Sequence, residues 1–179
     1  SHPDGQLSDD EFRWLTMRAQ GGFGLTMTCA AHVQAAGRGF PGQLGIYSHA
    51  LLDGHKRLAS AIGKAESIAV IQLHHAGMRS PKDLIDGAPL CPSRDEKTGA
   101  RALELDEVYT LRDDFVAAAR RAQEAGYHGV EVHGAHGYIL CQFLSGRYNR
   151  RSDTYGGPLE NRARLIYEIL RGIREVCGS

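Results

Sequence analysis

Ile68-Ala-Val-Ile-Gln-Leu73 is the clearest strand signal in the sequence, and it decides the fold class. Two further β-prone runs lie on either side of it along the chain, at residues 23–30 and 129–133. The first of these runs alternates little between apolar and polar residues, which predicts burial on both faces, as in a parallel sheet.

Helical patterns separate the three predicted strands. They are expected at residues 8–19, where Ser8 and Glu11 form a capping-box sequence, then at 51–66, at 111–125 and from Pro158 onward. Strands that alternate with helices indicate a parallel sheet, either doubly wound or closed as a barrel. No Gly-x-Gly-x-x-Gly sequence follows a strand. We therefore predict an α/β fold, a parallel (β/α) TIM-barrel segment of about three strands and four helices, as an incomplete barrel.

The composition narrows the classes of function. Lysine plus arginine and aspartate plus glutamate both total 21, so the formal net charge is zero, which argues against binding to nucleic acid or to an anionic membrane. There is no apolar run long enough to span a bilayer and no signal-peptide pattern at the start. Four widely spaced cysteines are expected to be free thiols. We expect a cytoplasmic protein that binds a small-molecule substrate.

A long polar excursion follows the central strand. Residues 77–103 contain Pro81, Pro89 and Pro92 and far exceed the usual length of a loop between a strand and a helix. This length predicts a lid or binding loop that covers part of a site.

Histidines concentrate where the predicted strands end. Five of the nine in the chain lie there: His32, His74, His75, His133 and His136. The active site of a (β/α) barrel collects at the carboxyl ends of its strands. The sequence therefore predicts a site at this end of the sheet.

The segment from His133 to Tyr138 carries the most chemical information. His133 and His136 can share one pocket only if the chain bends between them, which Gly134 permits and Gly137 can extend. Two imidazole donors directed at one point form an oxyanion or carbonyl site, and Tyr138 offers a phenolic proton nearby. The alternative is a buried core histidine and a tyrosine that only packs.

Three other groups have two interpretations each. Gln72 is an amide in an apolar strand, so it bonds either neighbouring backbone or a polar ligand. His74 and His75 are adjacent, so only one of them faces inward. Arg147, Arg150 and Arg151 form either a phosphate patch or a solvated loop.

Beyond these single residues, the motifs closely resemble those of the old yellow enzyme family, FMN-dependent NADH:flavin oxidoreductases on a TIM barrel. The resemblance spans essentially the whole chain and rests on three stretches: Gln72-Leu-His-His-Ala-Gly77, His133-Gly-Ala-His-Gly-Tyr-Ile-Leu-Cys-Gln-Phe-Leu-Ser145 and Asn149-Arg-Arg-Ser-Asp-Thr-Tyr-Gly-Gly157 with Glu160-Asn-Arg162.

The resemblance implies a role for each matched residue. His133 and His136 hydrogen-bond the acceptor oxygen of the ligand above the flavin, and Tyr138 is the proton donor to the substrate α-carbon. Gln72 contacts the pyrimidine edge of FMN, and Ala30 lies against its ring. NAD(P)H would reduce FMN, and hydride would then pass to the β-carbon of an activated alkene.

The chain also departs from the family pattern. Gly146 stands where proline is usual, and Pro158 where a small N-capping residue is common. A (β/α) barrel needs about 250 residues. The resemblance therefore implies that residues 1–179 form a single partial FMN-oxidoreductase barrel domain, without the first strand and strands five to eight.

Three hypotheses follow for function. The first is an FMN-dependent ene-reductase-type oxidoreductase. The second is a non-catalytic half-barrel that self-associates or needs a partner chain supplying the remainder of the barrel, because three strands leave two unpaired edges. The third and weakest is a metal-dependent barrel enzyme that uses His133, His136 and His75, although the family resemblance implies no metal.

Overall fold

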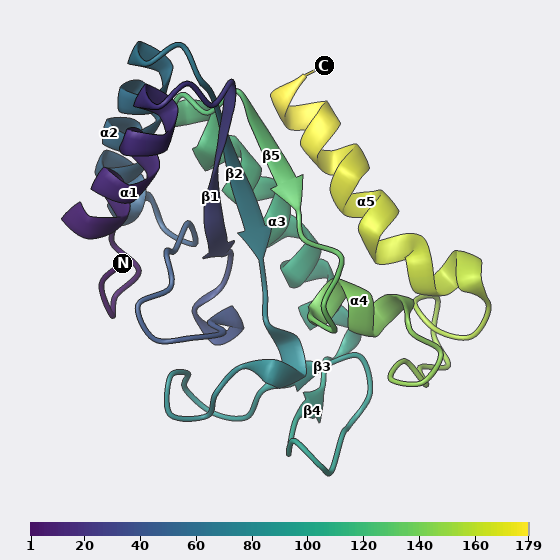
Figure 1. Cartoon of the computed structure of the whole chain (residues 1–179). Helices are drawn as coiled ribbons and strands as arrows, with labels where there is room; N and C mark the ends of the chain where they lie inside the picture. Colours follow the sequence, from purple (N-terminus) through teal and green to yellow (C-terminus); the bar gives the residue numbers. More distant parts are fainter. Residues whose placement is uncertain (179) are drawn as a thin grey trace.

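The computed structural model describes residues 1–178 and has alternating helices and strands (Figure 1). The helices are α1 (Asp9–Gln20), α2 (Leu52–Lys64), α3 (Leu105–Glu124), α4 (Ile139–Leu144) and α5 (Leu159–Cys177), with short 3-10 turns η1 (Ala35–Gly37), η2 (His49–Leu51) and η3 (Gly77–Arg79). The strands are β1 (Leu25–His32), β2 (Ile68–His74), β3 (Leu90–Cys91), β4 (Arg101–Ala102) and β5 (Gly129–Val132).

The main sheet has three parallel strands in the order β1-β2-β5. The register places Ala30 beside Gln72 and Gln72 beside Glu131, with an irregularity in β1 between Met27 and Ala30. Consecutive parallel strands joined through helices are the repeating unit of a (β/α) barrel. The predicted fold class is thus confirmed.

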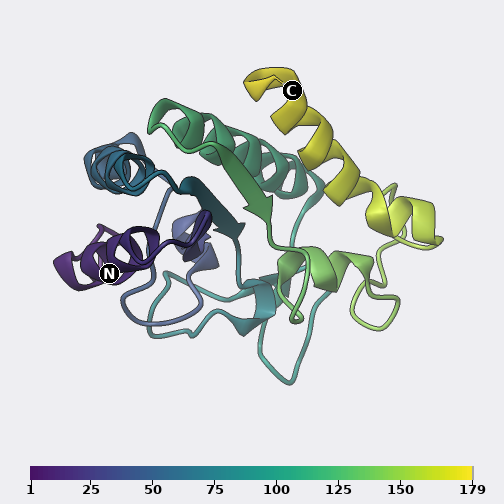
Figure 2. The same cartoon turned by 45° about the horizontal axis from the view of Figure 1, so that its top comes forward.

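Helices cover one face of this sheet and leave the other open (Figure 2). In β2, Ala69, Ile71 and Leu73 are fully buried toward the helices, whereas Ile68 on the opposite face is 49% exposed. The prediction that the first strand is buried on both faces is wrong, because the side chains of β1 alternate between buried and accessible positions. The open face is the one that would line the interior of a closed barrel.

The hydrophobic core lies between the sheet and the helices. Large, fully buried members of this core on α2, β2 and α3 are Leu58, Ile62, Ile71, Leu73, Leu111 and Phe115. This core fixes the strands in place and so sets the positions of the residues at their carboxyl ends.

Residues 77–103 fold into an ordered excursion that contains β3, β4 and a small core of their own. Met78, Cys91 and Ala100 are buried together, and Tyr148 packs against them from the loop after α4. The excursion is therefore held on the segment that follows the histidines.

Some local predictions needed correction. Ser8 caps α1 by accepting a hydrogen bond from the Glu11 amide at 3.2 Å, but the Glu11 carboxylate turns to Cys29 and does not close a capping box. A complete box occurs instead at Glu104 and Glu107, so α3 begins six residues before the predicted face. Helix α4 was not predicted.

Within the described part of the chain, all four cysteines are free thiols, as predicted. Over the same residues, none of the helices combines the length and the apolar character needed to cross a membrane.

Candidate active site

His133 and His136 are brought together by a tight turn directly after β5. The Tyr138 amide donates to the Ala135 carbonyl at 3.2 Å, and the two residues between them, His136 and Gly137, have φ of 55° and 69°. Positive φ at both central positions is the conformation of a type I′ turn. The predicted bend therefore occurs, but it lies at His136 and Gly137 and not at Gly134.

The hydrogen bonds of this turn define the tautomers of the two rings. The Ala135 amide donates to His133 Nδ1 at 3.2 Å, so the neutral His133 ring carries its hydrogen on Nε2. That Nε2 lies 3.3 Å from His136 Nδ1 and donates to it. Burial lowers the pKa of His133, and the neighbouring His136 lowers it further, which favours this neutral form. The Nε2–H group of His136 is then free to face a ligand.

His74, at the end of β2, lies against the same group. Its ring centroid is 5.4 Å from that of His133 and 4.3 Å from that of Tyr138. Its Nδ1 accepts from Gln43 Nε2 at 3.0 Å, so its hydrogen is on Nε2, a buried atom without a hydrogen-bond partner. Desolvation lowers the pKa of His74 to about 3, and the nearby His133 contributes in the same direction. His74 therefore presents a neutral, unpaired N–H donor.

Tyr138 stands at the centre of this histidine group. Its ring meets those of His74 and His133 edge-on, with interplanar angles of 83° and 86°. The guanidinium of Arg79 lies 5.4 Å from the centroid of the tyrosine ring and donates through Nη1 to the His136 carbonyl at 2.9 Å. Both the hydroxyl-bearing ring and the turn that carries it are thus held by contacts.

Gln72 and Ala30 lie side by side on the open face of the sheet. Gln72 pairs with Ala30 in the register of β1 and β2, and its Nε2 donates to Glu131 Oε1 at 2.6 Å. The partner of the Gln72 side chain is thus another polar side chain on the open face and not the neighbouring backbone. A small side chain and an amide thus lie side by side on the accessible face of the sheet, two residues before His74 on β2.

His75 packs inside the protein and does not contribute to the site. Its Nδ1 accepts from the Gly77 amide at 3.0 Å, and its buried ring packs directly on Gly37. Residues 1–178 contain no group of three or more His, Cys, Asp or Glu side chains arranged to hold a metal ion. The hypothesis of a metal-dependent enzyme with His75 as a ligand therefore lacks its ligand set.

The three arginines after α4 separate into two kinds. Arg151 is 9% exposed, pairs with Asp153 at 2.6 Å and donates to the Pro92 carbonyl at 3.0 Å. It ties the excursion to this loop. Arg147 and Arg150 instead line a cavity of about 330 Å³ that adjoins the histidine turn at Gly137.

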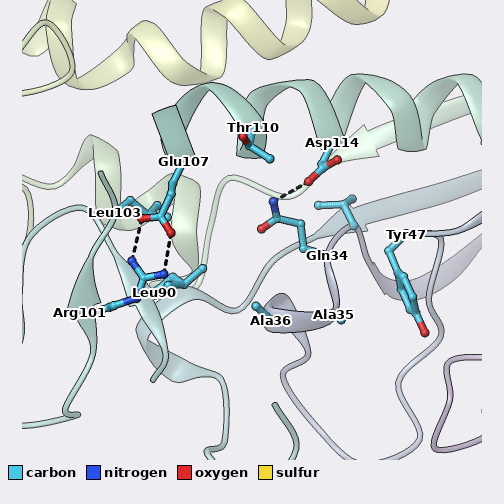
Figure 3. Close-up of a pocket in the computed structure, with 11 residues that line it drawn as sticks. Gln34, Ala35, Ala36, Tyr47, Leu90, Arg101, Leu103, Glu107, Thr110 and Asp114 are labelled. Carbon is cyan, nitrogen blue, oxygen red and sulfur yellow. Dashed lines mark hydrogen bonds and ion pairs between the residues drawn. The ribbon is translucent and has the colours of Figure 1, made fainter. Parts of the chain in front are cut away.

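A separate cavity of about 480 Å³ lies on the outer side of the sheet, between the loop after β1 and the start of α3 (Figure 3). Four of its polar side chains are paired with one another: Gln34 Nε2 donates to Asp114 at 2.6 Å, and Arg101 binds Glu107 through both of its terminal nitrogens at 2.6 and 2.7 Å. None of the residues that line it belongs to the histidine group.

Two members of the site had no assigned role in the sequence prediction. His74 and His75 are adjacent, and nothing in their local sequence indicates which of the two faces the site. Gln43 lies in a glycine-rich loop, and no local pattern marks it as the partner of a histidine 31 residues away.

Known proteins resemble this chain in sequence and in fold. The family model for the NADH:flavin oxidoreductase / NADH oxidase family matches residues 1–179. The probable NADH-dependent flavin oxidoreductase of Bacillus subtilis is 39% identical over 183 residues, which is 100% of this chain and 49% of the relative. The NADPH dehydrogenase of Listeria welshimeri is 38% identical over 97% of this chain and 52% of its own length.

Solved structures agree as well. The old yellow enzyme homologue from Zymomonas mobilis superposes with a TM-score of 0.92 at 31% identity, over 99% of this chain and 53% of that one. The chain thus spans about half the length of the relatives that it matches. Since the family model covers every residue, the chain belongs to the NADH:flavin oxidoreductase / NADH oxidase family, the old yellow enzyme family that its motifs indicate.

Proposed function

We propose that this chain carries the substrate-polarising half of an FMN-dependent oxidoreductase that transfers hydride from NAD(P)H, through the flavin, to an activated alkene. The observation that carries the proposal is the convergence of His74, His133, His136 and Tyr138 beside the open strip formed by Ala30 and Gln72. Neutral N–H donors and a phenol at one point suit an acceptor oxygen next to a carbon that gains a proton.

The residues present fit the ring of FMN. Ala30 offers a small side chain on the accessible face, and the neighbouring Gln72 amide has a donor and an acceptor for a pyrimidine edge. His74 adds a buried N–H that has no partner among the described residues. When bound, FMN would accept hydride from NAD(P)H and deliver it to the β-carbon of the alkene.

The two histidines of the turn would bind the substrate carbonyl. In the structure, His133 Nε2–H is directed to His136 Nδ1, so a ligand oxygen competes with His136 for that hydrogen. Once the ligand oxygen accepts the hydrogen bond from His133 Nε2–H in place of His136, both rings can place an N–H where enolate charge develops. The lowered pKa of His133 keeps its ring neutral, so it acts as a hydrogen-bond donor.

Tyr138 would supply the proton. Its ring is fixed by edge-on contacts with His74 and His133, so the hydroxyl has a defined direction relative to the oxygen-binding donors. In the proposed step the Oη proton moves to the substrate α-carbon as hydride arrives at the β-carbon, and solvent then reprotonates the tyrosinate.

The test combines FMN loading with substrate turnover. The protein is incubated with FMN, desalted and assayed for retained flavin absorbance, and then for NADPH oxidation that depends on a cyclic enone. Tyr138→Phe is expected to lower enone turnover by about 10²–10⁴-fold while flavin reduction by NADPH continues. Tyr167→Phe, on an exposed residue of α5, is the matched control and should leave both steps unchanged. Retained FMN with equal turnover in Tyr138→Phe would remove the assigned role.

A second candidate is a half-barrel that becomes competent only when further strands complete it. The outer edges of β1 and β5 have no strand partner within residues 1–178, and Leu25 and Ile68 on the accessible side are 52% and 49% exposed. Native mass measured together with flavin content separates the two candidates. A monomer that retains FMN supports the first, whereas flavin retained only in an oligomer or with an added partner chain supports the second.

A further inference from the structure

We propose that the cavity between η3, the excursion and the loop after α4 is a phosphate-binding subsite, which holds a phosphate or diphosphate group of a molecule whose reacting end lies at the histidines. The assignment of the reacting end to the histidines rests on the proposed function, whereas the binding of phosphate in this cavity can be tested by itself. The cavity of about 330 Å³ is lined by Met78, Arg79, Asp95, Lys97, Thr98, Gly137, Arg147, Tyr148 and Arg150.

The cavity is basic in a chain whose net charge is zero. Four of its nine lining residues are cationic and one is acidic. The carboxylate of that acidic residue, Asp95, is engaged locally, since its Oδ1 accepts from the amide and the hydroxyl of Thr98, both at 2.9 Å. Since neutral hydrogen-bond donors leave the charge of this carboxylate in place, it is the excess of four cations over one anion that makes the field inside the cavity positive.

The cationic side chains form no direct ion pair with a carboxylate of the described residues, although, besides its hydrogen bonds, the charges of Arg150 and Lys97 contribute to the lowered pKa of the Asp95 carboxyl. Among the described residues, Arg79, Lys97, Arg147 and Arg150 form no salt bridge. Their neighbour Arg151, by contrast, is fully paired with Asp153. Guanidinium and ammonium groups that surround a cavity and lack carboxylate partners suit a ligand with several anionic oxygens.

The backbone that carries these side chains is braced. The guanidinium of Arg150 donates to the carbonyls of Arg147 and Arg94 at 3.1 and 2.9 Å, which links the loop after α4 to the excursion. Tyr148 is packed on the small core of Met78, Cys91 and Ala100. The guanidinium of Arg150 and the backbone around Tyr148 are thus held before any ligand arrives, so less ordering of this part of the wall is required on binding.

The subsite is also continuous with the histidine turn. Arg79 lines the cavity and donates to the His136 carbonyl, and Gly137 is part of the cavity wall. A molecule anchored by its phosphate in this cavity would extend past Gly137 to the oxygen-binding donors. The phosphate can belong to the nicotinamide reductant or to a phosphorylated substrate, and the recognition chemistry is the same for both.

The primary test is the binding of inorganic pyrophosphate to the purified chain without FMN, measured by calorimetry at two salt concentrations. The test variant is Lys97→Gln/Arg147→Gln, because neither side chain makes a hydrogen bond to another described residue, so the fold should be retained. Arg13→Gln/Lys64→Gln removes the same charge from exposed positions on α1 and α2 and is the control. Far-ultraviolet circular dichroism checks the fold of each protein.

We expect the test variant to bind pyrophosphate about tenfold or more weakly than the wild type, and the control to bind as the wild type does. No saturable binding to the wild type, or an equal loss in the control, would overturn the subsite. In FMN-loaded protein, a raised KM for NADPH alone assigns the phosphate to the reductant. A raised KM for a phosphate-bearing enone, but not for its unphosphorylated analogue, assigns it to the substrate. Failure to load FMN would count against the proposed function and leave the pyrophosphate result intact.

Discussion

The side-chain amide of Gln43 fixes the ring of His74. Gln43 Oε1 accepts from the Gly39 amide at 2.6 Å, so its Nε2 must be the group that donates to His74 Nδ1 at 3.0 Å and to the Ala30 carbonyl at 2.8 Å. One residue of a glycine-rich loop therefore sets the tautomer of a histidine on β2 and braces the backbone of β1 beside the proposed flavin position.

Gln43→Leu is expected to destabilise the protein by roughly 1–3 kcal/mol, because it leaves the buried Nδ1 of His74 without a partner, and it also removes the part-buried bonds to Gly39 and Ala30. Urea unfolding measures this loss. The ¹⁵N shifts of His74 report the tautomer directly, with Nδ1 as the unprotonated nitrogen only in the wild type. Gln20→Leu, at an exposed end of α1, should change neither quantity.

Replacing either histidine of the turn tests the oxygen-binding pair. Removal of one donor that faces developing negative charge typically lowers kcat about 10²–10³-fold, and His133→Ala and His136→Ala are each expected to fall in this range for enone reduction. The double variant should be little slower than either single one, because the two rings act as a unit. His49→Ala, with a 70% exposed side chain, is the control. Strictly additive losses would show that the two rings act independently.

Stability should fall as the pH is lowered, because buried histidines must gain charge. Desolvation lowers the pKa of His32 to about 4 and that of His74 and His75 to about 3, from an ordinary value of 6.5. The unfolded chain therefore binds more protons than the folded one below pH 6.5. The free energy of unfolding then decreases by about 1.4 kcal/mol per pH unit for each histidine, down to those folded-state values.

Urea unfolding between about pH 7.5 and 5 isolates this effect, because most carboxylates titrate lower. His74→Gln should reduce the slope by the contribution of one ring, while His32, His75, His55 and His133, whose pKa values burial also lowers, continue to contribute. A stability that is flat over this range would mean that the three histidines do not remain neutral and buried in the folded state.

Replacement of Gly77 and of Gly63 by alanine is expected to change the stability of the protein in opposite directions. Gly77 has φ of 64°, and a Cβ there would collide with the side chain of Gln142, which itself donates to the Gly137 carbonyl at 2.7 Å. Gly77→Ala should therefore cost at least about 1–2 kcal/mol and disturb the histidine turn. Gly63 lies in α2, and the nearest atom to an added Cβ is 4.0 Å away, so Gly63→Ala should stabilise by about 0.5–1 kcal/mol. Thermal unfolding of both variants measures the two effects. Unfolding temperatures that shift in the same direction would contradict the left-handed backbone at Gly77 or the helical backbone at Gly63.

The parts of the fold and site that could be predicted from the sequence are those with a local signal. The three strands of the main sheet are apolar runs bounded by turn residues, and His133, His136 and Tyr138 are joined by a six-residue segment. Helix α4 could not be predicted because its six residues, Ile-Leu-Cys-Gln-Phe-Leu, have no capping signal. Strands β3 and β4 could not be predicted because each has only two residues.

Long-range pairings could not be predicted at all. Gln43 meets His74, and Arg79 meets the His136 carbonyl, only after the strands have been placed beside one another. The arginine cluster shows the same limit. Its members are close in sequence, yet the largely buried side chain of Arg151 pairs with Asp153 whereas Arg147 lines a cavity, and no local pattern separates the two.

The left-handed backbone of His136 limits how this position can change during evolution. Among residues other than glycine, asparagine, aspartate and histidine enter that region most readily, whereas β-branched residues are strongly disfavoured there. The backbone conformation of the turn thus restricts which residues are tolerated at position 136, independently of any effect on ligand binding. Asparagine would keep both the backbone conformation and an N–H donor, so it is the most accessible route by which a descendant of this protein could alter its ligand preference without rebuilding the loop.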